Sequence, residues 1–368
     1  MKMSQFCVML KPASAGCDLR CRYCFYWDEA GQRETASFGK MRPETLRDCL
    51  ESVRESAQPG DTVTLAFQGG EPTLAGLDFF RTVIDLTGQW PKNIRLQYTL
   101  QTNGLHLDEE WCAFLKKHNF LVGISYDLLP EYHDAARVDI AGKGTARRVE
   151  AAIANLQKAG VSFNVLCTLT NPVARHPRQV WKRLGELGIE YVQFTPCLAP
   201  LEGESLYTLT PRRFAAFYNG LFPLWLTDYR AGRYRSVKLF DDVLNRLAYG
   251  TSGTCGMGGQ CSPQIVVEAD GSVYPCDFYC LEAYALGNLC QSTLPDLLGS
   301  EKMTDFLRRP TEMPGLCENC RWNAFCGGGC PRMRREVCCA PGESFCGYRN
   351  FLDTNTDALL SLAAGARR

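Results

Sequence analysis

The sequence predicts an α/β protein in which a partial (β/α)6 barrel is followed by a small cysteine-rich domain. Strand-like and helix-like segments alternate from residue 6 to about residue 195, and polar motifs follow the ends of several strand-like segments. Twelve of the twenty cysteines fall between Cys255 and Cys346. Repeated strand–helix units build parallel sheets with right-handed crossovers. Because six units are too few for a closed eight-fold barrel, an open barrel is expected, with ligands at the carboxyl ends of the strands.

The expected strands are short, rich in Val, Ile, Phe and Tyr, and mostly bounded by Gly, Pro, Asn or Asp. They cover residues 6–10, 63–68, 94–101, 121–126, 163–169 and 191–194. The expected helices between and after them cover 43–56, 77–87, 109–118, 145–159, 178–187, 211–229 and 236–249. Pro43 suits a first helical turn, and Gly160 and Gly188 suit helix ends.

Length and composition bound the class of protein. The 368 residues suggest about two domains. We expect residues 1–235 to form the barrel, 236–348 the cysteine-rich domain and 349–368 a C-terminal helix. Lysine plus arginine and aspartate plus glutamate balance at 40 each, so bulk electrostatics give no sign of a nucleic-acid or membrane partner. Without a signal peptide or a run of about 18 apolar residues, we expect a cytoplasmic protein.

Three cysteines near the N-terminus follow the first expected strand with the spacing Cys17-x3-Cys21-x2-Cys24. Three thiolates on one loop can take three corners of a [4Fe–4S] cluster, which leaves the fourth iron open for a ligand. A zinc site with its fourth ligand elsewhere, or a chance spacing, is the alternative.

A second group of cysteines gives the spacings Cys255-x5-Cys261-x14-Cys276 and Cys317-x2-Cys320-x5-Cys326-x3-Cys330, followed by Cys346. Eight cysteines are the number that two fully ligated [4Fe–4S] clusters require. Two tetrahedral zinc sites fit the spacing about as well. The cysteines that stand singly in the first 200 residues are expected to be small buried hydrophobes; they are Cys7, Cys49, Cys112, Cys167 and Cys197.

The triplet, with Tyr23 inside it and Phe25-Tyr26 after it, resembles the signature of radical S-adenosylmethionine (SAM) enzymes. Gln68-Gly-Gly-Glu-Pro72 resembles the GGEP motif of that superfamily, in which glycine permits close approach of the backbone to SAM. The resemblance implies that SAM binds the open iron and is cleaved to a 5′-deoxyadenosyl radical. The implied SAM-binding residues are Tyr23, Gly70, Glu71, Ser125, Arg137 and Leu198.

The run from Cys317 to Cys330 resembles the SPASM domain of radical SAM enzymes that modify peptides and proteins. That resemblance implies two auxiliary [4Fe–4S] clusters, which with the first make three. One cluster would take Cys255, Cys261, Cys276 and Cys330, and the other Cys317, Cys320, Cys326 and Cys346. Cys338 and Cys339 lie close enough in sequence to replace Cys346 as a ligand.

Nearly the whole chain resembles the anaerobic sulfatase-maturating enzymes, with matches at 11–14, 24–26, 66–76, 100–104 and 270–279. The family oxidises a Ser or Cys of a sulfatase polypeptide to Cα-formylglycine. The resemblance implies that Asp277 is the catalytic base and that Tyr26 and Gln68 line the peptide groove. The alternative for Asp277 is a carboxylate that only accepts hydrogen bonds from amides of the cluster loop. An unfolded or nascent sulfatase and an electron donor such as flavodoxin or ferredoxin are the implied partners.

Two departures from the family pattern leave peptide specificity open. Ser125-Tyr-Asp-Leu-Leu-Pro130 stands where the family has Ser-Met-Asp-Gly-Pro, and Pro331 and Met333 replace positions that are often basic. The alternatives are a related radical SAM enzyme that forms thioethers or epimerises a ribosomal peptide, and a non-catalytic zinc-binding protein. The first strand begins near Met1, so we expect no N-terminal peptide-binding domain of the kind that the first alternative typically carries.

Overall fold

The computed structural model describes residues 5–251, 253–340 and 342–366. The chain divides into two compact units, each assembled from distant segments. The first unit holds the chain up to Ser125 with Arg137–Phe163 and Pro263–Arg309. The second holds Tyr126–Ala136, Asn164–Ser262 and the chain from Pro310. The two units collect segments that contact one another and do not test where domains begin and end. The predicted domain boundaries at 235/236 and 348/349 therefore stay predictions.

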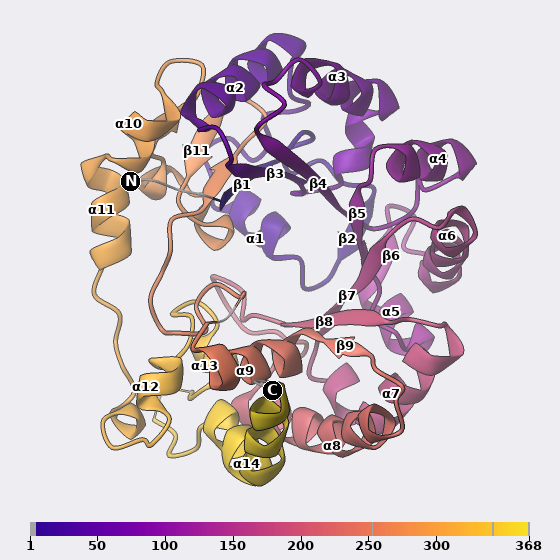
Figure 1. The fold of residues 1–368 in the computed structure, drawn as a ribbon, viewed down its shortest axis with the longest axis vertical. Helices are drawn as coiled ribbons and strands as arrows, with labels where there is room; N and C mark the ends of the chain where they lie inside the picture. Colours follow the sequence, from indigo (N-terminus) through magenta and orange to yellow (C-terminus); the bar gives the residue numbers. More distant parts are fainter. Residues whose placement is uncertain (1–4, 252, 341, 367–368) are drawn as a thin grey trace. The chain divides into compact units, whose positions relative to one another are not determined.

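The first unit contains a mixed sheet with the strand order β12-β11-β10-β1-β3-β4-β5. Figure 1 labels β11, β1, β3, β4 and β5 of these strands. The strands are β1 (Gln5–Leu10), β3 (Thr62–Phe67), β4 (Arg95–Thr102), β5 (Leu121–Ser125), β10 (Ile265–Val267), β11 (Ser272–Tyr274) and β12 (Gly287–Asn288). From β10 to β5 all neighbours pair in parallel, with Val8 opposite both Leu65 and Ile265. The side chains of Val8 and Leu65 are fully buried, so the sheet centre carries the core.

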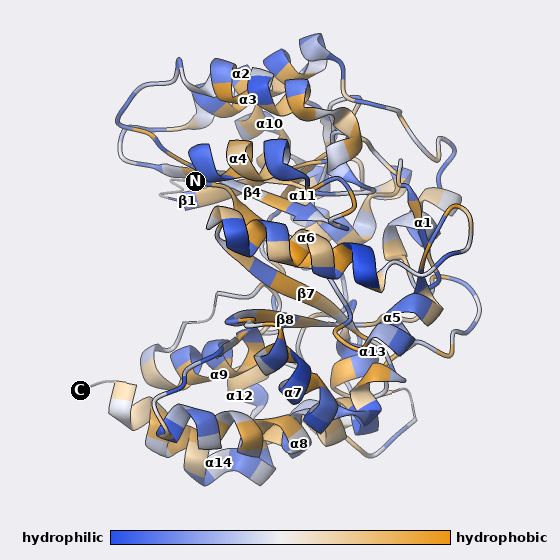
Figure 2. Cartoon of the chain, turned by 90° about the vertical axis from the view of Figure 1, so that its right-hand side faces the viewer, coloured by the Kyte–Doolittle hydropathy of each residue, from blue (hydrophilic) through white to orange (hydrophobic). Residues whose placement is uncertain are grey.

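Amphipathic helices accompany this sheet, with hydrophobic and hydrophilic residues interspersed along each of them (Figure 2). They are α1 (Phe25–Gly31), α2 (Pro43–Ser56), α3 (Leu77–Thr87), α4 (Glu109–Lys117), α6 (Ala146–Ala159), α10 (Leu294–Leu298) and α11 (Glu301–Arg308). A separate antiparallel pair joins β2 (Leu19–Cys21) to β6 (Arg137–Asp139). Helix α2 begins at Pro43 and α6 ends against Gly160, which adopts the left-handed conformation. Pro43 at the start of a helix and Gly160 at the end of another therefore act as the sequence predicts.

The second unit contains β7 (Phe163–Leu169, from Asn164 on), β8 (Tyr191–Pro196) and β9 (Ser236–Val237), paired in parallel in that order. Its helices are α5 (Pro130–Ala136), α7 (Pro177–Glu186), α8 (Pro211–Arg230), α9 (Lys238–Tyr249), α12 (Asn323–Cys326), α13 (Arg334–Val337) and α14 (Gly347–Ala366). Helix α14 packs on α8 and α9, and Phe240 of α9 stacks with Phe351 of α14 at 5.8 Å between ring centroids. The structure thus has a helix over Gly347–Ala366, and residues 367 and 368 of the predicted C-terminal helix lie outside the described residues.

All six predicted strands are present, within two residues at each end. The prediction of one helix over 236–249 is wrong at its start, because Ser236 and Val237 pair with β8 and the helix begins at Lys238. Strand β10 was missed because three residues, Ile-Val-Val, are too short a run to distinguish from loop. It matters here because it lies directly beside β1.

Candidate active site and cluster sites

The loops after β1 and β3 meet at the carboxyl end of the sheet, as parallel pairing requires. The amide of Gly70 donates to the carbonyl of Ser14 at 2.8 Å, and that of Glu71 to the carbonyl of Gly16 at 2.7 Å. A Cβ added to Gly70 would lie 2.2 Å from the Gly16 oxygen. Glycine is thus required because the Gly-Gly turn packs against the backbone that leads into Cys17. Packing within the chain is therefore a second reason for glycine at this position, besides the close approach of the backbone to SAM that the sequence suggested.

The predicted cysteine triplet is organised by two local structures. Cys21 is paired with Arg137 in the β2–β6 ladder, and the Arg137 guanidinium lies 3.9 Å from the Cys21 sulfur and 5.4 Å from the Tyr23 ring centroid. Cys24 is the residue that precedes the first turn of α1. The structure therefore brings Tyr23 and Arg137, two of the predicted SAM-binding residues, to the cysteine loop.

Glu71 is fully buried and accepts four hydrogen bonds from protein groups. Its Oε1 accepts from the amide and hydroxyl of Thr73 and the hydroxyl of Thr102, and its Oε2 from the amide of Asn103. Burial raises the pKa of this carboxyl despite those bonds. The carboxylate therefore ties the end of β3 to the end of β4.

Asp18, inside the cysteine loop, connects that loop to the segment after β4. The Asn103 amide donates to Asp18 Oδ1 at 2.7 Å, and His106 Nε2 lies 3.0 Å from Oδ2. Burial acts to raise the pKa of Asp18, but the bonds to His106 and Asn103 outweigh it and lower the pKa. The same pairing raises the pKa of His106. The loop is thus held by charge-assisted hydrogen bonds.

The predicted base, Asp277, follows Cys276 at the end of the β11 segment and meets Tyr26 from α1. The Tyr26 hydroxyl donates to Asp277 Oδ2 at 2.6 Å, while Lys11 Nζ lies 3.3 Å from Oδ1. Burial, followed by the nearby Asp277 charge, raises the pKa of Tyr26 well above its ordinary value, so the phenol keeps its proton. Two residues that the sequence assigned to different roles therefore form one hydrogen-bonded pair.

Around Asp277 lies a buried charge cluster, which we define as Lys11, Glu29, Arg33, Glu268 and Asp277. Lys11 and Glu268 follow the paired strands β1 and β10, and their charged atoms are 3.6 Å apart. Arg33 donates to Glu268 at 2.8 Å. The Lys11 ammonium also lies 3.1 Å from the sulfur of Cys280, which is fully buried. Two cations here face three carboxyl groups in a desolvated space.

The pKa values of three groups in this cluster reflect the opposing effects of burial and of neighbouring charges. Burial opposes ionisation of Lys11, but Cys280, Asp277 and Glu268 outweigh it and raise the Lys11 pKa. Burial likewise acts to raise the pKa of Glu268, but Lys11 and Arg33 hold it below its ordinary value. At Glu29 burial wins and raises the pKa to about 8. The cluster therefore favours one protonated carboxyl, at Glu29, at neutral pH.

Four cysteines predicted for one auxiliary cluster line a single cavity in the second unit. The cavity is lined by Cys317, Cys320, Cys326 and Cys346, and also by Cys338 and Cys339. Burial raises the pKa of Cys326 to about 11, whereas a hydrogen bond from Cys338 lowers that of Cys346 to about 7. A set of thiols around one space has the donor chemistry that an iron–sulfur cluster needs.

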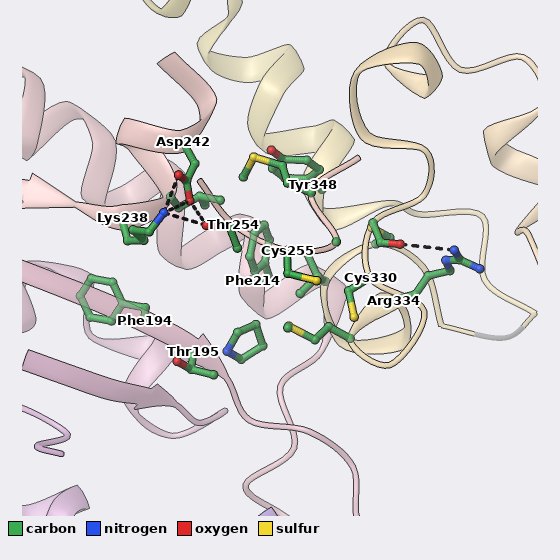
Figure 3. Close-up of a pocket in the computed structure, with 18 of the residues that line it drawn as sticks. Phe194, Thr195, Phe214, Lys238, Asp242, Thr254, Cys255, Cys330, Arg334 and Tyr348 are labelled. Carbon is green, nitrogen blue, oxygen red and sulfur yellow. Dashed lines mark hydrogen bonds and ion pairs between the residues drawn. The ribbon is translucent and has the colours of Figure 1, made fainter. Parts of the chain in front are cut away.

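Two of the cysteines predicted for the other auxiliary cluster line a second cavity of about 150 Å³ in the same unit. The sulfur atoms of Cys255 and Cys330 face the same space, with Lys238, Asp242 and Thr254 forming a hydrogen-bonded group at its far side (Figure 3). Burial raises the pKa of Cys330, and Cys255 and Cys261 add to that effect. In the described ranges, no group of three or more His, Cys, Asp or Glu side chains is arranged so that it could hold a single metal ion.

The remaining predicted residues are placed as follows. Ser125 is the last residue of β5, and Gln68, directly after β3, is buried with its amide 3.0 Å from the Met9 sulfur. Leu198 follows β8 in the second unit and is partly exposed. Cys276 lies in the first unit, next to Asp277. Their roles stay predictions.

The sequence did not predict Arg33, Glu29 or Glu268 as site residues, nor the role of Lys11. In the sequence, Lys11 stands in the run 11–14 that resembles the family. The position of Lys11 directly after an apolar strand would have indicated this role, because a buried positive charge requires acidic partners. Glu268 also follows an apolar tripeptide directly. No local pattern indicates Glu29 or Arg33.

Comparison with known proteins gives matches to two family models and to several relatives. Residues 12–194 match the radical SAM superfamily and residues 255–321 match the SPASM iron–sulfur cluster-binding domain. A cysteine-type anaerobic sulfatase-maturating enzyme of Clostridium perfringens is 38% identical, covering 98% of this chain and 99% of its own. That of Clostridium novyi is 37% identical over 98% of both. A serine-type enzyme of Klebsiella pneumoniae is 29% identical over 95% of this chain and 87% of its own.

Solved structures extend the similarity to the fold. The structure of native anSMEcpe with bound AdoMet and the Cp18Cys peptide has a TM-score of 0.89 and 37% identity, over 98% of this chain and 99% of that one. The predicted α/β fold class, with a radical SAM core and a SPASM domain, is confirmed, as are SAM and iron–sulfur clusters as the cofactors of its kind. In the described part of the chain, no helix is long and apolar enough to cross a membrane. The chain belongs to the family of anaerobic sulfatase-maturating enzymes, within the radical SAM superfamily.

Proposed function

We propose that this enzyme oxidises a cysteine of a sulfatase polypeptide to Cα-formylglycine. The observation that carries the proposal is the similarity over nearly the whole chain to cysteine-type enzymes, at 37–40% identity, against 28–29% for serine-type enzymes. The same similarity favours this function over the alternative of thioether formation or epimerisation of a ribosomal peptide.

We propose that Cys17, Cys21 and Cys24 hold the cluster that binds SAM, next to Tyr23, Gly70 and Arg137. Glu71, Ser125 and Leu198 complete the proposed SAM site, Glu71 by fixing the strand ends. The two auxiliary clusters would be held by the two sets of four cysteines given above. When bound, SAM and its cluster supply a radical that removes one hydrogen atom from the substrate Cβ.

The chain's own residues then have to accept one proton from the substrate thiol. Asp277 is the proposed base. Tyr26 holds Oδ2 by a 2.6 Å hydrogen bond, and Lys11 lies 3.3 Å from Oδ1. Oδ1 accepts no hydrogen bond from the described residues, although it is paired with Lys11. This oxygen is buried beside Lys11 and has an unused acceptor position. It is the atom proposed to accept the substrate proton, while the other oxygen orients the carboxylate. Gln68 and Tyr26 would line the peptide groove.

The electron balance requires a second acceptor. Removing a hydrogen atom and a proton leaves one further electron to be lost before a carbon–sulfur double bond forms. The two four-cysteine sets would hold auxiliary clusters, and a cluster bound there would supply an acceptor for this electron. Water then adds and hydrogen sulfide leaves, giving the aldehyde. We also propose a cytoplasmic enzyme supplied by a flavodoxin- or ferredoxin-type donor, because exposed thiolates and clusters persist in a reducing compartment.

The test is anaerobic incubation with SAM, a reductant and matched sulfatase-motif peptides carrying Cys or Ser, followed by mass spectrometry. We expect conversion of the Cys peptide to the aldehyde. In Asp277→Asn, SAM cleavage should persist while product is suppressed. Undiminished product would remove Asp277 as the base, and SAM cleavage without any peptide change would reject the substrate. About twelve iron atoms per chain are expected after reconstitution; two zinc atoms and no iron would reject the radical chemistry.

A further inference from the structure

Glu268 is a buried carboxylate close to the proposed base, and the reaction given above assigns it no part. It follows strand β10 directly and is 1% exposed. Its Oε1 accepts a hydrogen bond from Arg33 at 2.8 Å and lies 3.6 Å from Nζ of Lys11. Burial acts to raise the pKa of Glu268, but Lys11 and Arg33 outweigh it and keep the pKa below its ordinary value. The side chain is therefore charged at neutral pH and paired with two cations.

Strand pairing places Glu268 and Lys11 beside each other. Leu10 of β1 lies opposite Val267 of β10 in a parallel register, and Lys11 and Glu268 are the next residues along the two strands. The backbone continues this pairing, because the amide of Lys11 donates to the carbonyl of Val267 at 2.9 Å. The two side chains therefore leave the sheet from fixed neighbouring positions.

The Lys11 ammonium is shared among three acceptor groups. It donates to the Cys280 sulfur at 3.1 Å, and it lies 3.3 Å from Oδ1 of Asp277 and 3.6 Å from Oε1 of Glu268. Oδ1 of Asp277 accepts no hydrogen bond from the described residues, so Lys11 is an ion-pair partner of this oxygen and not its hydrogen-bond donor. An ammonium group has three N–H donors to distribute. Cys280 and Glu268 thus compete with Asp277 for them.

We propose that Glu268 is a positioning residue for the base: it attracts the Lys11 ammonium away from Oδ1 of Asp277 and so keeps that oxygen open to the substrate. The inference rests on the role proposed above for Asp277. Without the Glu268 charge, the attraction between Lys11 and Asp277 would be less opposed, and a hydrogen bond between an ammonium and a carboxylate is a strong one. Because Tyr26 already donates to Oδ2, closure of Lys11 onto Oδ1 would leave both oxygens engaged.

The test measures oxidation of a Cys sulfatase-motif peptide by the reconstituted protein carrying Glu268→Gln, Glu268→Asp or, as the control, Asp61→Asn. The Gln variant removes the charge at nearly unchanged size, and the Asp variant retains it on a shorter side chain. Asp61 is also a buried carboxylate, at 5% exposed, but it precedes β3 at the opposite end of the sheet. The readouts are kcat and KM, product formed per SAM cleaved, and iron content.

In Glu268→Gln we expect kcat to fall by about 10- to 100-fold, as for a misplaced catalytic group, while KM for the peptide changes less. Iron should stay at about twelve atoms per chain, and SAM cleavage should continue with less product per SAM cleaved. A defect of the fold alone would lower SAM cleavage and product together. Glu268→Asp should recover part of kcat, and Asp61→Asn should match the unchanged protein.

Two results would overturn the proposal. One is an unchanged kcat in Glu268→Gln at full iron content. The other is a parallel loss of SAM cleavage and product that Glu268→Asp does not recover, because Glu268 would then only support the fold. Failure of the proposed function is recognised separately in Asp277→Asn: undiminished product there would reject the base, and with it this role of Glu268, even if Glu268→Gln lowers kcat.

Discussion

The Tyr26 hydroxyl donates a 2.6 Å hydrogen bond to the carboxylate of Asp277, across 251 positions of sequence. Tyr26 comes from the helix that follows the cysteine loop, and Asp277 from the segment after β11. The pair therefore couples the loop proposed to hold the SAM cluster to the residue proposed as the base.

Replacing Tyr26 by Phe should lower kcat for peptide oxidation, because Asp277 would lose the donor that fixes its orientation. A hydrogen bond to a charged group contributes about 1.5–3 kcal/mol, which corresponds to a fall of roughly 10- to 160-fold. KM for the peptide should change less than kcat. Tyr191→Phe is the control, since Tyr191 is 53% exposed at the start of β8. Equal kcat in both variants would show that the hydrogen bond has no part in turnover.

Lys11→Met should destabilise the fold strongly. The ammonium is buried and pairs with Glu268 and Asp277, so its loss leaves carboxylates without a compensating charge. Breaking a buried ion pair typically costs about 3–5 kcal/mol of unfolding free energy. Urea unfolding of the reconstituted protein measures the effect, with the exposed Lys40→Met as control. A loss below about 1 kcal/mol, the range of surface pairs, would contradict the importance of this cluster.

Gly70→Ala should prevent proper formation of the first cluster site. The added Cβ would lie 2.2 Å from the carbonyl oxygen of Gly16, so the loop leading to Cys17 must shift. We expect reconstituted iron to fall from about twelve to about eight atoms per chain. Gly31→Ala is the control, because a Cβ there meets nothing within 4 Å. Full iron content in Gly70→Ala would show that the loop tolerates the shift.

Glu29 should make stability fall as pH rises. Burial raises its pKa from 4.5 to about 8 in the folded protein, so the folded state binds the proton more tightly than the unfolded state. Its contribution is complete below pH 4.5 and is lost progressively up to about pH 8, at up to about 1.4 kcal/mol per pH unit. Neighbouring Lys11, Arg33 and Asp277 face the same carboxyl.

The measurement is the thermal unfolding midpoint between pH 5 and 8 for the unchanged protein and for Glu29→Gln. The variant should show a shallower fall over this range, because its amide does not titrate. Parallel profiles would mean that Glu29 does not change its protonation state there.

Sequence patterns predicted six strands and most helices because each carries its own periodicity and terminators. Pro43 begins α2, and Gly160 ends α6 in a left-handed conformation. Strand β10 has three residues and was not predicted, because so short a run can be recognised as a strand from its pairing with β1 but not from its composition. For the same reason the residues next to β10, such as Glu268, were not expected at the site.

By itself the sequence determined which reactive groups and motifs are present. These are the cysteine spacings, the Gly-Gly-Glu-Pro turn and an aspartate beside Cys276, all properties of short contiguous segments. Only the tertiary structure decided that Tyr26 donates to Asp277 and that Lys11 and Arg33 balance buried carboxyl groups. The physical reason is that these interactions are short in space between segments far apart in the chain. Strand pairing and desolvation set them, and no local pattern of residues encodes either.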